Sequence, residues 1–320
     1  NKKKFYWQES RYWKYLNSPN LKISLIDKIA KKVNFLLIKL FGVKIIKTKY
    51  HQDRSFKSFP INKDIIAIKN IKIKEEVLNF LSAYDIFPNN NEIIESIYKF
   101  DEIYHKWDQH YHSRGGMGYN NSLFLFILVK FTNAETIIES GVARGFTTYI
   151  IDTAIKNQNK KLYCFDINLK NLDYKSSYAK YYENDIEEIN LDFDGRKTLI
   201  FLDDHVSHLE RVEYIIKKNI KYAIFDDDLS LLNFHSDGWP PIPTFNMLYK
   251  NLTFFKQNNE IKWSNNSNLA NMNSKEILEK YKNIDQFFKK KKFEYNIIPE
   301  LFNFTGYRNS SQTSFIKFDK

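Results

Sequence analysis

The chain has 320 residues, of which 43% are hydrophobic and 27% are charged, and its formal net charge at pH 7 is +11. This composition excludes an intrinsically disordered chain, because enough apolar surface is present to form a core. The single cysteine excludes a disulfide within the chain, and no apolar run reaches the roughly 20 residues that a membrane span needs. We therefore expect a cytoplasmic protein, since thiols stay reduced there.

The positive charge favours an anionic partner, and a solvated lysine-rich surface is the alternative interpretation. Residues 1–115 are predicted to form a helical, basic N-terminal section. Its clearest helix covers residues 24–41, where Leu25, Ile29 and Val33 share one face and lysines occupy the other. Docking of this helix on the protein body is the favoured interpretation, and peripheral contact with the inner face of a membrane is left open.

Helices are predicted next at residues 74–84 and 92–107, and residues 116–320 are predicted to form a second domain. In this domain helices alternate with short apolar segments that end in acids or in a glycine turn. We predict strands at residues 136–140, 161–165, 197–202, 222–225, 293–298 and 314–318, and helices at 122–131, 146–156, 208–219 and 274–289. The pattern predicts an α/β fold with a doubly wound, mostly parallel sheet and an antiparallel C-terminal strand pair.

The segment at residues 137–145 joins a strand to a helix and reads Ile-Ile-Glu-Ser-Gly-Val-Ala-Arg-Gly. Glycine lets the backbone approach a ligand closely, and the start of the helix offers unpaired N–H groups. The dinucleotide pattern G-x-G-x-x-G is absent, because the spacing here is E-x-G-x-x-x-G. A second acid, Asp166, ends the next strand, where a carboxylate can accept hydrogen bonds from two vicinal hydroxyls.

These residues resemble the first motifs of class I S-adenosylmethionine-dependent methyltransferases, across roughly residues 115–320. The resemblance implies a Rossmann-like sheet in which the glycine turn wraps the methionine part of the cofactor. Asp166 would then bind the ribose, and Asp185 would lie near the adenine. Arg114, in a glycine-rich stretch, is a further candidate that would pair with the cofactor carboxylate, with a flexible linker as the alternative. The expected cofactor-binding residues are Glu139, Gly141, Ala143, Gly145, Asp166, Asp185 and Arg114.

Two acidic segments, at residues 203–205 and 226–228, follow neighbouring predicted strands. Carboxylates that crowd together repel one another, so a divalent cation, Mg²⁺ or Mn²⁺, is expected. The segments resemble those of metal-dependent sugar O-methyltransferases. That resemblance implies a metal at Asp203, Asp226 and Asp227, although a shift of one residue would bring in Asp204 or Asp228. The family's base position is held here by His205, so His205 and Asp204 are the candidate catalytic residues.

The resemblance implies an O-methyltransferase that acts on a sugar or glycan hydroxyl. An anionic or lipid-linked acceptor would suit the positive charge. A nucleic-acid methyltransferase is the second hypothesis, and it is disfavoured because carboxylates at the acceptor site repel phosphates. A non-catalytic module that binds a membrane or a protein partner is the third, since fold does not fix function. The sequence predicts no oligomeric state.

Overall fold

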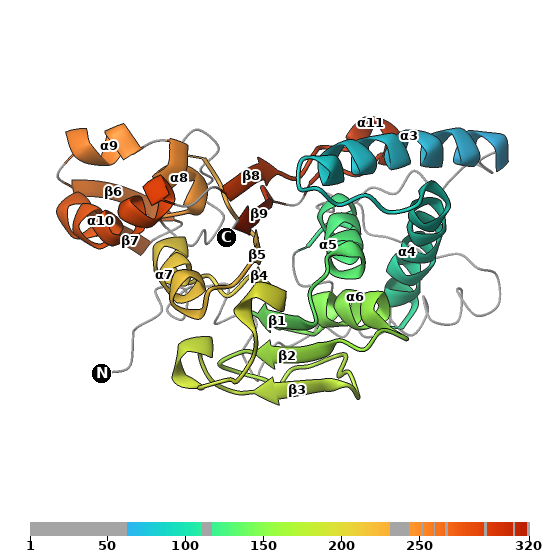
Figure 1. The fold of residues 1–320 in the computed structure, drawn as a ribbon, viewed down its shortest axis with the longest axis horizontal. Helices are drawn as coiled ribbons and strands as arrows, with labels where there is room; N and C mark the ends of the chain where they lie inside the picture. Colours follow the sequence, from blue (N-terminus) through green and yellow to red (C-terminus); the bar gives the residue numbers. More distant parts are fainter. Residues whose placement is uncertain are drawn as a thin grey trace, which may run out of the picture. The chain divides into compact units, whose positions relative to one another are not determined.

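The computed structural model describes residues 63–110, 117–230 and 243–318, without residues 251, 259, 266–267, 291–292 and 310. Its described strands form a seven-stranded sheet in the order β3-β2-β1-β4-β5-β9-β8 (Figure 1). The strands are β1 (Thr136–Ser140), β2 (Lys161–Phe165), β3 (Ala179–Tyr182), β4 (Thr198–Leu202), β5 (Tyr222–Phe225), β8 (Phe293–Ile297) and β9 (Ser314–Phe318). The first five are parallel, and β9 runs antiparallel to both β5 and β8. The predicted fold class is confirmed.

Helices cover both faces of the sheet, because successive side chains of a buried strand point to opposite sides. Ile137 packs with the helices of one face, and its neighbour Ile138 packs with those of the other. The first layer holds α3 (Lys63–Ser82), α4 (Asn90–His110), α5 (Tyr119–Phe131) and α6 (Phe146–Ile155). The second holds α7 (His208–Lys218), α8 (Phe245–Lys250), α9 (Leu252–Gln257) and α10 (Ser274–Lys290). Figure 1 shows the two layers on opposite sides of the strands.

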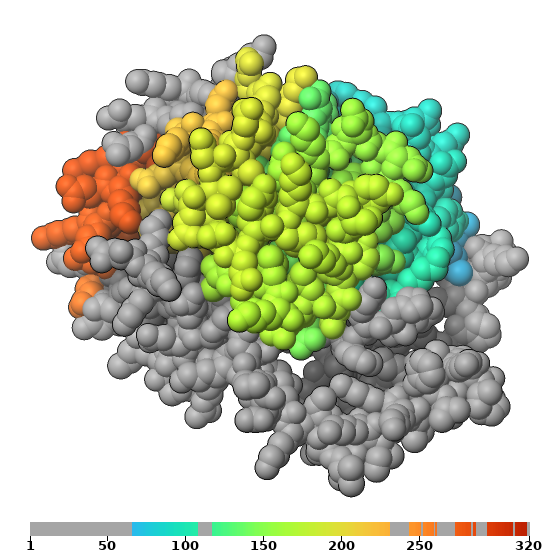
Figure 2. All heavy atoms as spheres, turned by 90° about the horizontal axis from the view of Figure 1, so that it is seen from below, coloured from blue at the N-terminus to red at the C-terminus, as the bar shows by residue number. Residues whose placement is uncertain are grey.

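Short elements complete the described part of the chain. They are the 3₁₀ turns η2 (Ile186–Glu188) and η3 (Gly195–Lys197), the hairpin β6 (Glu260–Asn265) and β7 (Asn268–Asn273), and α11 (Phe302–Thr305). In Figure 2 the green-to-yellow stretch around β2 and β3 forms the face toward the viewer, with the teal α4 region on one side and the orange α10 region on the other. The segment between β2 and β4 therefore contributes a continuous surface.

The predicted N-terminal section is described only in part. Its helix at residues 24–41 lies outside the described residues, as does Arg114. The described helices α3 and α4 share one hydrophobic core with α5, α6 and the sheet. The domain boundary between residues 115 and 116 stays a prediction. No described helix is long and apolar enough to cross a membrane.

Candidate active site

The turn after β1 brings the backbone of two strands into close contact. Gly141 has a φ of +95°, and a Cβ built on it would lie 2.1 Å from the carbonyl oxygen of Asp203, the residue after β4. Gly145 has a φ of +88°, and a Cβ there would lie 2.4 Å from the carbonyl oxygen of Tyr174. Ala143, between them, also has a positive φ of 49°. Glycine is needed at both ends of the turn for its conformation and for the space it leaves.

Asp166, at the end of β2, holds this turn through its carboxylate. Its Oδ2 accepts hydrogen bonds from the backbone N–H groups of Val142 (2.9 Å) and Ala143 (2.8 Å), and its Oδ1 accepts one from Asn168 (2.9 Å). An ionised carboxylate has about four acceptor positions, so these three bonds leave room for a hydroxyl donor. Burial raises the pKa of Asp166, while the three N–H groups lower it. The acid is thus fixed beside the turn.

Glu139 lies beneath the same turn and is fully buried. Its carboxylate accepts hydrogen bonds from the hydroxyls of Thr147 and Thr148 (2.6 Å for Thr148) and from the thiol of Cys164 (3.3 Å). Burial raises its pKa to about 7, although the Thr147 and Thr148 hydroxyls lower it. The side chain therefore joins β1, α6 and β2, and its predicted contact with a cofactor remains a prediction.

The glycine turn and the acidic segments meet where the strand order reverses. The chain runs outward from β1 to β2 and β3, and it then returns to the other side of β1 for β4 and β5. The N–H of Asp203 donates to the carbonyl of Ser140, and the N–H of Asp226 donates to that of Leu202 (2.8 and 2.9 Å). Ligands of open α/β sheets bind at the carboxyl ends of the strands at such a reversal.

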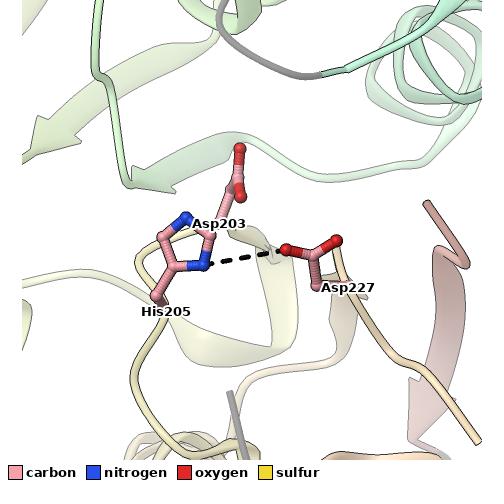
Figure 3. Close-up of side chains that lie close together, drawn as sticks. All are labelled: Asp203, His205 and Asp227. Atoms are coloured by element: carbon pink, nitrogen blue, oxygen red, sulfur yellow. Dashed lines mark ion pairs between the residues drawn. The ribbon is translucent and has the colours of Figure 1, made fainter. Parts of the chain in front are cut away.

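Three side chains converge at this edge: Asp203, His205 and Asp227 (Figure 3). One potential ligand atom from each lies within 4.8 Å of the others. The Nδ1 of His205 is 3.7 Å from an oxygen of Asp227, and both side chains are about a quarter exposed. Both residues have a positive φ, 55° for His205 and 52° for Asp227. Strained backbone conformations cluster at functional sites, but Asp85, Asn157 and Asn219 share this conformation outside the cluster, so it supports the site only together with the convergence of the side chains.

The carboxylates in this cluster are electrostatically crowded. Burial, and then the charges of Asp226 and Asp227, raise the pKa of Asp203 well above its usual range. Burial and Asp226 raise the pKa of Asp227 to about 6, against a lowering by His205. A bound cation would relieve this repulsion.

Asp226 and Asp228, on either side of Asp227, accept hydrogen bonds from other parts of the chain. The Oδ1 of Asp226 accepts hydrogen bonds from the hydroxyls of Ser311 (2.7 Å) and Thr313. Asp228 is fully buried and accepts from Ser314 (2.6 Å), Tyr295 (2.9 Å) and the N–H of Asn246 (2.7 Å). The predicted ligands Asp203 and Asp227 are brought together with His205, whereas Asp226 is not part of that group.

Asp204 and Asp185 are both paired with Arg211 of α7, a residue that the sequence interpretation missed. Arg211 is 1% exposed, and its guanidinium contacts Asp204 at 2.8 Å and Asp185 at 2.8 Å. Asp204 also accepts a hydrogen bond from the hydroxyl of Ser140 (2.5 Å). The sequence contained an indication of this role, because Arg211 interrupts the apolar face of the helix between Leu209 and Val212. A buried arginine requires a carboxylate partner.

Comparison with known proteins finds similarity only in structure. No protein-family model and no curated protein matches the sequence. An O-methyltransferase from Streptomyces achromogenes, TomG, in complex with S-adenosylmethionine, is 9% identical, with a TM-score of 0.38 over 76% of this chain and 96% of that one. A Bacillus cereus O-methyltransferase is 12% identical (TM-score 0.37, 76% and 97%), and a Podospora anserina methyltransferase is 11% identical (0.40, 82% and 98%).

Proposed function

We propose that the protein is a class I S-adenosylmethionine-dependent O-methyltransferase whose acceptor is a sugar or glycan hydroxyl. One observation carries the proposal. The Asp166 carboxylate accepts hydrogen bonds from the backbone of the turn at residues 141–145, and this turn lies where the strand order of the sheet reverses. This turn abuts Asp203, so a cofactor bound on it would lie beside the cluster of Asp203, His205 and Asp227. A donor site next to a polar, titratable site is what methyl transfer to oxygen requires.

Each group would have a distinct task in this reaction. When bound, S-adenosylmethionine supplies an electrophilic methyl group on its sulfonium. The glycine turn would hold the methionine part, and Asp166 would accept a hydrogen bond from a ribose hydroxyl. His205 would remove the proton of the acceptor hydroxyl, and Asp227, 3.7 Å from its Nδ1, would orient the imidazole. Asp204 is less suited to act as the base, because its carboxylate is engaged by Arg211 and Ser140.

The donor set also fits a divalent cation, held by Asp203, Asp227 and His205. A cation there would lower the pKa of a bound hydroxyl. Two carboxylates and one imidazole suit Mn²⁺ better than Mg²⁺, which prefers oxygen ligands alone. In that case His205 would be a ligand and the base would be another group. Mn²⁺ binding by variants of the cluster distinguishes these two roles of His205.

The proposed acceptor follows from the negative charge of the acidic cluster and from the positive net charge of the chain. The acidic cluster would repel the phosphates of a nucleic acid, whereas a neutral sugar hydroxyl would meet no such barrier. The net charge of +11 would suit an anionic or lipid-linked glycan whose charges lie away from the methylated hydroxyl and from the acidic cluster. Transfer of a labelled methyl group to glycan fractions and to RNA, compared in one assay, tests this choice. Labelled RNA without labelled glycan would overturn the proposed acceptor.

The cofactor is tested by calorimetry with S-adenosylmethionine on the wild type and on Asp166→Ala. The wild type should bind, and the variant should bind about 100-fold more weakly, because hydrogen bonds to a charged group contribute about 1.5–3 kcal/mol each. Asp194→Ala is the matched control. The Asp194 carboxylate also accepts a hydrogen bond from the backbone N–H two residues later, but Asp194 precedes β4, so it lies at the opposite edge of the sheet from the proposed site. No binding by the wild type would overturn the proposed function.

The cation is tested with Mn²⁺ by electron paramagnetic resonance. Asp227→Asn should weaken Mn²⁺ binding about 10-fold or more, because a ligand charge is lost. Asparagine tolerates the left-handed backbone at this position, so the loop should keep its shape. Asp192→Asn, at an exposed acid between β3 and β4, controls for the loss of one charge. Equal Mn²⁺ affinity in the two variants would contradict a cation site at Asp227 and would favour His205 as the base.

A further inference from the structure

Arg211 lies near the start of α7, is buried, and pairs with three acids. Its guanidinium makes five contacts of 2.8–3.3 Å: two to Asp204, two to Asp185 and one to Glu187. Four of these contacts are hydrogen bonds, and the fifth, from Nη2 to Asp204, is an ion pair. Burial alone would lower the pKa of Arg211, but the carboxylates of Asp204 and Asp185 raise it, so the group stays charged.

The acids that Arg211 joins belong to two loops that are far apart in the sheet. Asp185 follows β3, and Asp204 follows β4, whereas β2 and β1 lie between these strands. Those two intervening strands carry Asp166 and the glycine turn. Arg211, which belongs to α7, therefore links the two loops that flank the proposed cofactor site.

Each loop is fixed to Arg211 through further hydrogen bonds. Asp185 also accepts the N–H of Glu187 (2.9 Å) and so begins the η2 turn. Asp204 also accepts the N–H of Val206 (3.1 Å) and the hydroxyl of Ser140. Because Asp204 stands between Asp203 and His205 in the chain, its position constrains both neighbours. A movement at Asp185 would be transmitted through one rigid side chain to the loop that carries His205.

We infer that Arg211 is a positioning residue that ties residues 183–188, on the adenosine side of the site, to residues 203–206. This inference rests on the proposed function, since it assigns the two loops to one cofactor site. Arg211 would touch neither cofactor nor acceptor. It would set the separation of the two loops and, through Asp204, the placement of His205.

The test compares Arg211→Lys with the wild type, using S-adenosylhomocysteine as the ligand. Lysine keeps the charge but cannot bridge two carboxylates with a fork of N–H groups. We expect a folded variant whose Kd for S-adenosylhomocysteine rises at least 10-fold. Hydrogen exchange of the ligand-free protein should become faster at residues 183–188 and at 203–206 together. Arg196→Lys, which alters an exposed ion pair with Asp194, is the matched control.

Asp204→Asn provides a second, nearly isosteric variant should Arg211→Lys fail to fold. In this variant hydrogen exchange should become faster at residues 183–188, although residue 204 lies in the other loop, because the connection through Arg211 is weakened. A role confined to stability would lower the melting temperature and leave both the Kd and this distant exchange unchanged. That outcome would overturn the inference. Failure of the wild type to bind S-adenosylhomocysteine would instead overturn the proposed function, and the exchange data would still decide whether Arg211 links the loops.

Discussion

Gly141→Ala is expected to destabilise the fold and to abolish cofactor binding. A Cβ at this position would lie 2.1 Å from the carbonyl oxygen of Asp203, and φ is +95°. The left-handed backbone costs an L-residue about 1–2 kcal/mol, and the forced displacement adds about 1–3 kcal/mol, for a total of about 2–5 kcal/mol. The displaced atom belongs to backbone, so a change of rotamer cannot relieve the contact. Denaturant unfolding measures the loss, and calorimetry with S-adenosylmethionine measures binding in the folded fraction.

Gly306→Ala separates the cost of the backbone conformation from the cost of the close contact with Asp203. Gly306 also has a positive φ, +74°, but a Cβ there would meet no atom within 4 Å. The control should therefore lose only about 1–2 kcal/mol, the cost of the backbone conformation. Cofactor binding should be unchanged in the control. If both variants lost the same stability, the close approach of Gly141 to Asp203 would not matter, and the proposed junction of donor and acceptor sites would lose its support.

The strands that carry the site were predictable because they are buried on both faces. Such strands read as short apolar runs, and those at residues 136–140, 161–165 and 222–225 agree with the structure in their bounds. The edge strand β3 was not located, because its four residues are largely half-exposed and contain no apolar run. The hairpin of β6 and β7 was missed for a related reason, since its strands are rich in polar residues. Pattern reasoning detects short apolar runs, and none of these three strands contains one.

The roles of the individual acids could not be read from the chain alone. In the segment at residues 226–228, three identical side chains follow one strand. Asp226 and Asp228 are held by groups supplied by β9 and the residues before it, and this leaves Asp227 to face His205. These partners are remote in sequence. Likewise, the role of Arg211 could not be predicted, because its partners lie in the loops after β3 and β4, which come together only in the folded chain.

Glu139→Gln is expected to remove a pH dependence of stability that the wild type carries. The folded protein holds the Glu139 pKa at about 7, whereas an unfolded glutamate titrates near its usual value of about 4.3. Between these values the native state binds more protons than the unfolded state. The free energy of unfolding therefore falls as pH rises through this window. The stabilisation is complete below about pH 4 and is lost by about pH 7, with a total change of about 4 kcal/mol.

Glutamine resembles the protonated acid in shape and has no charge to bury. The difference in the free energy of unfolding between Glu139→Gln and the wild type should grow in favour of the variant from about pH 4 to pH 7, and then level off. Glu135→Gln, at an exposed acid just before β1 that pairs with Lys197, should show no such rise. Denaturant unfolding at a series of pH values measures both variants. A difference that stayed constant with pH would mean that Glu139 is ionised in the folded protein, held by Thr147, Thr148 and Cys164.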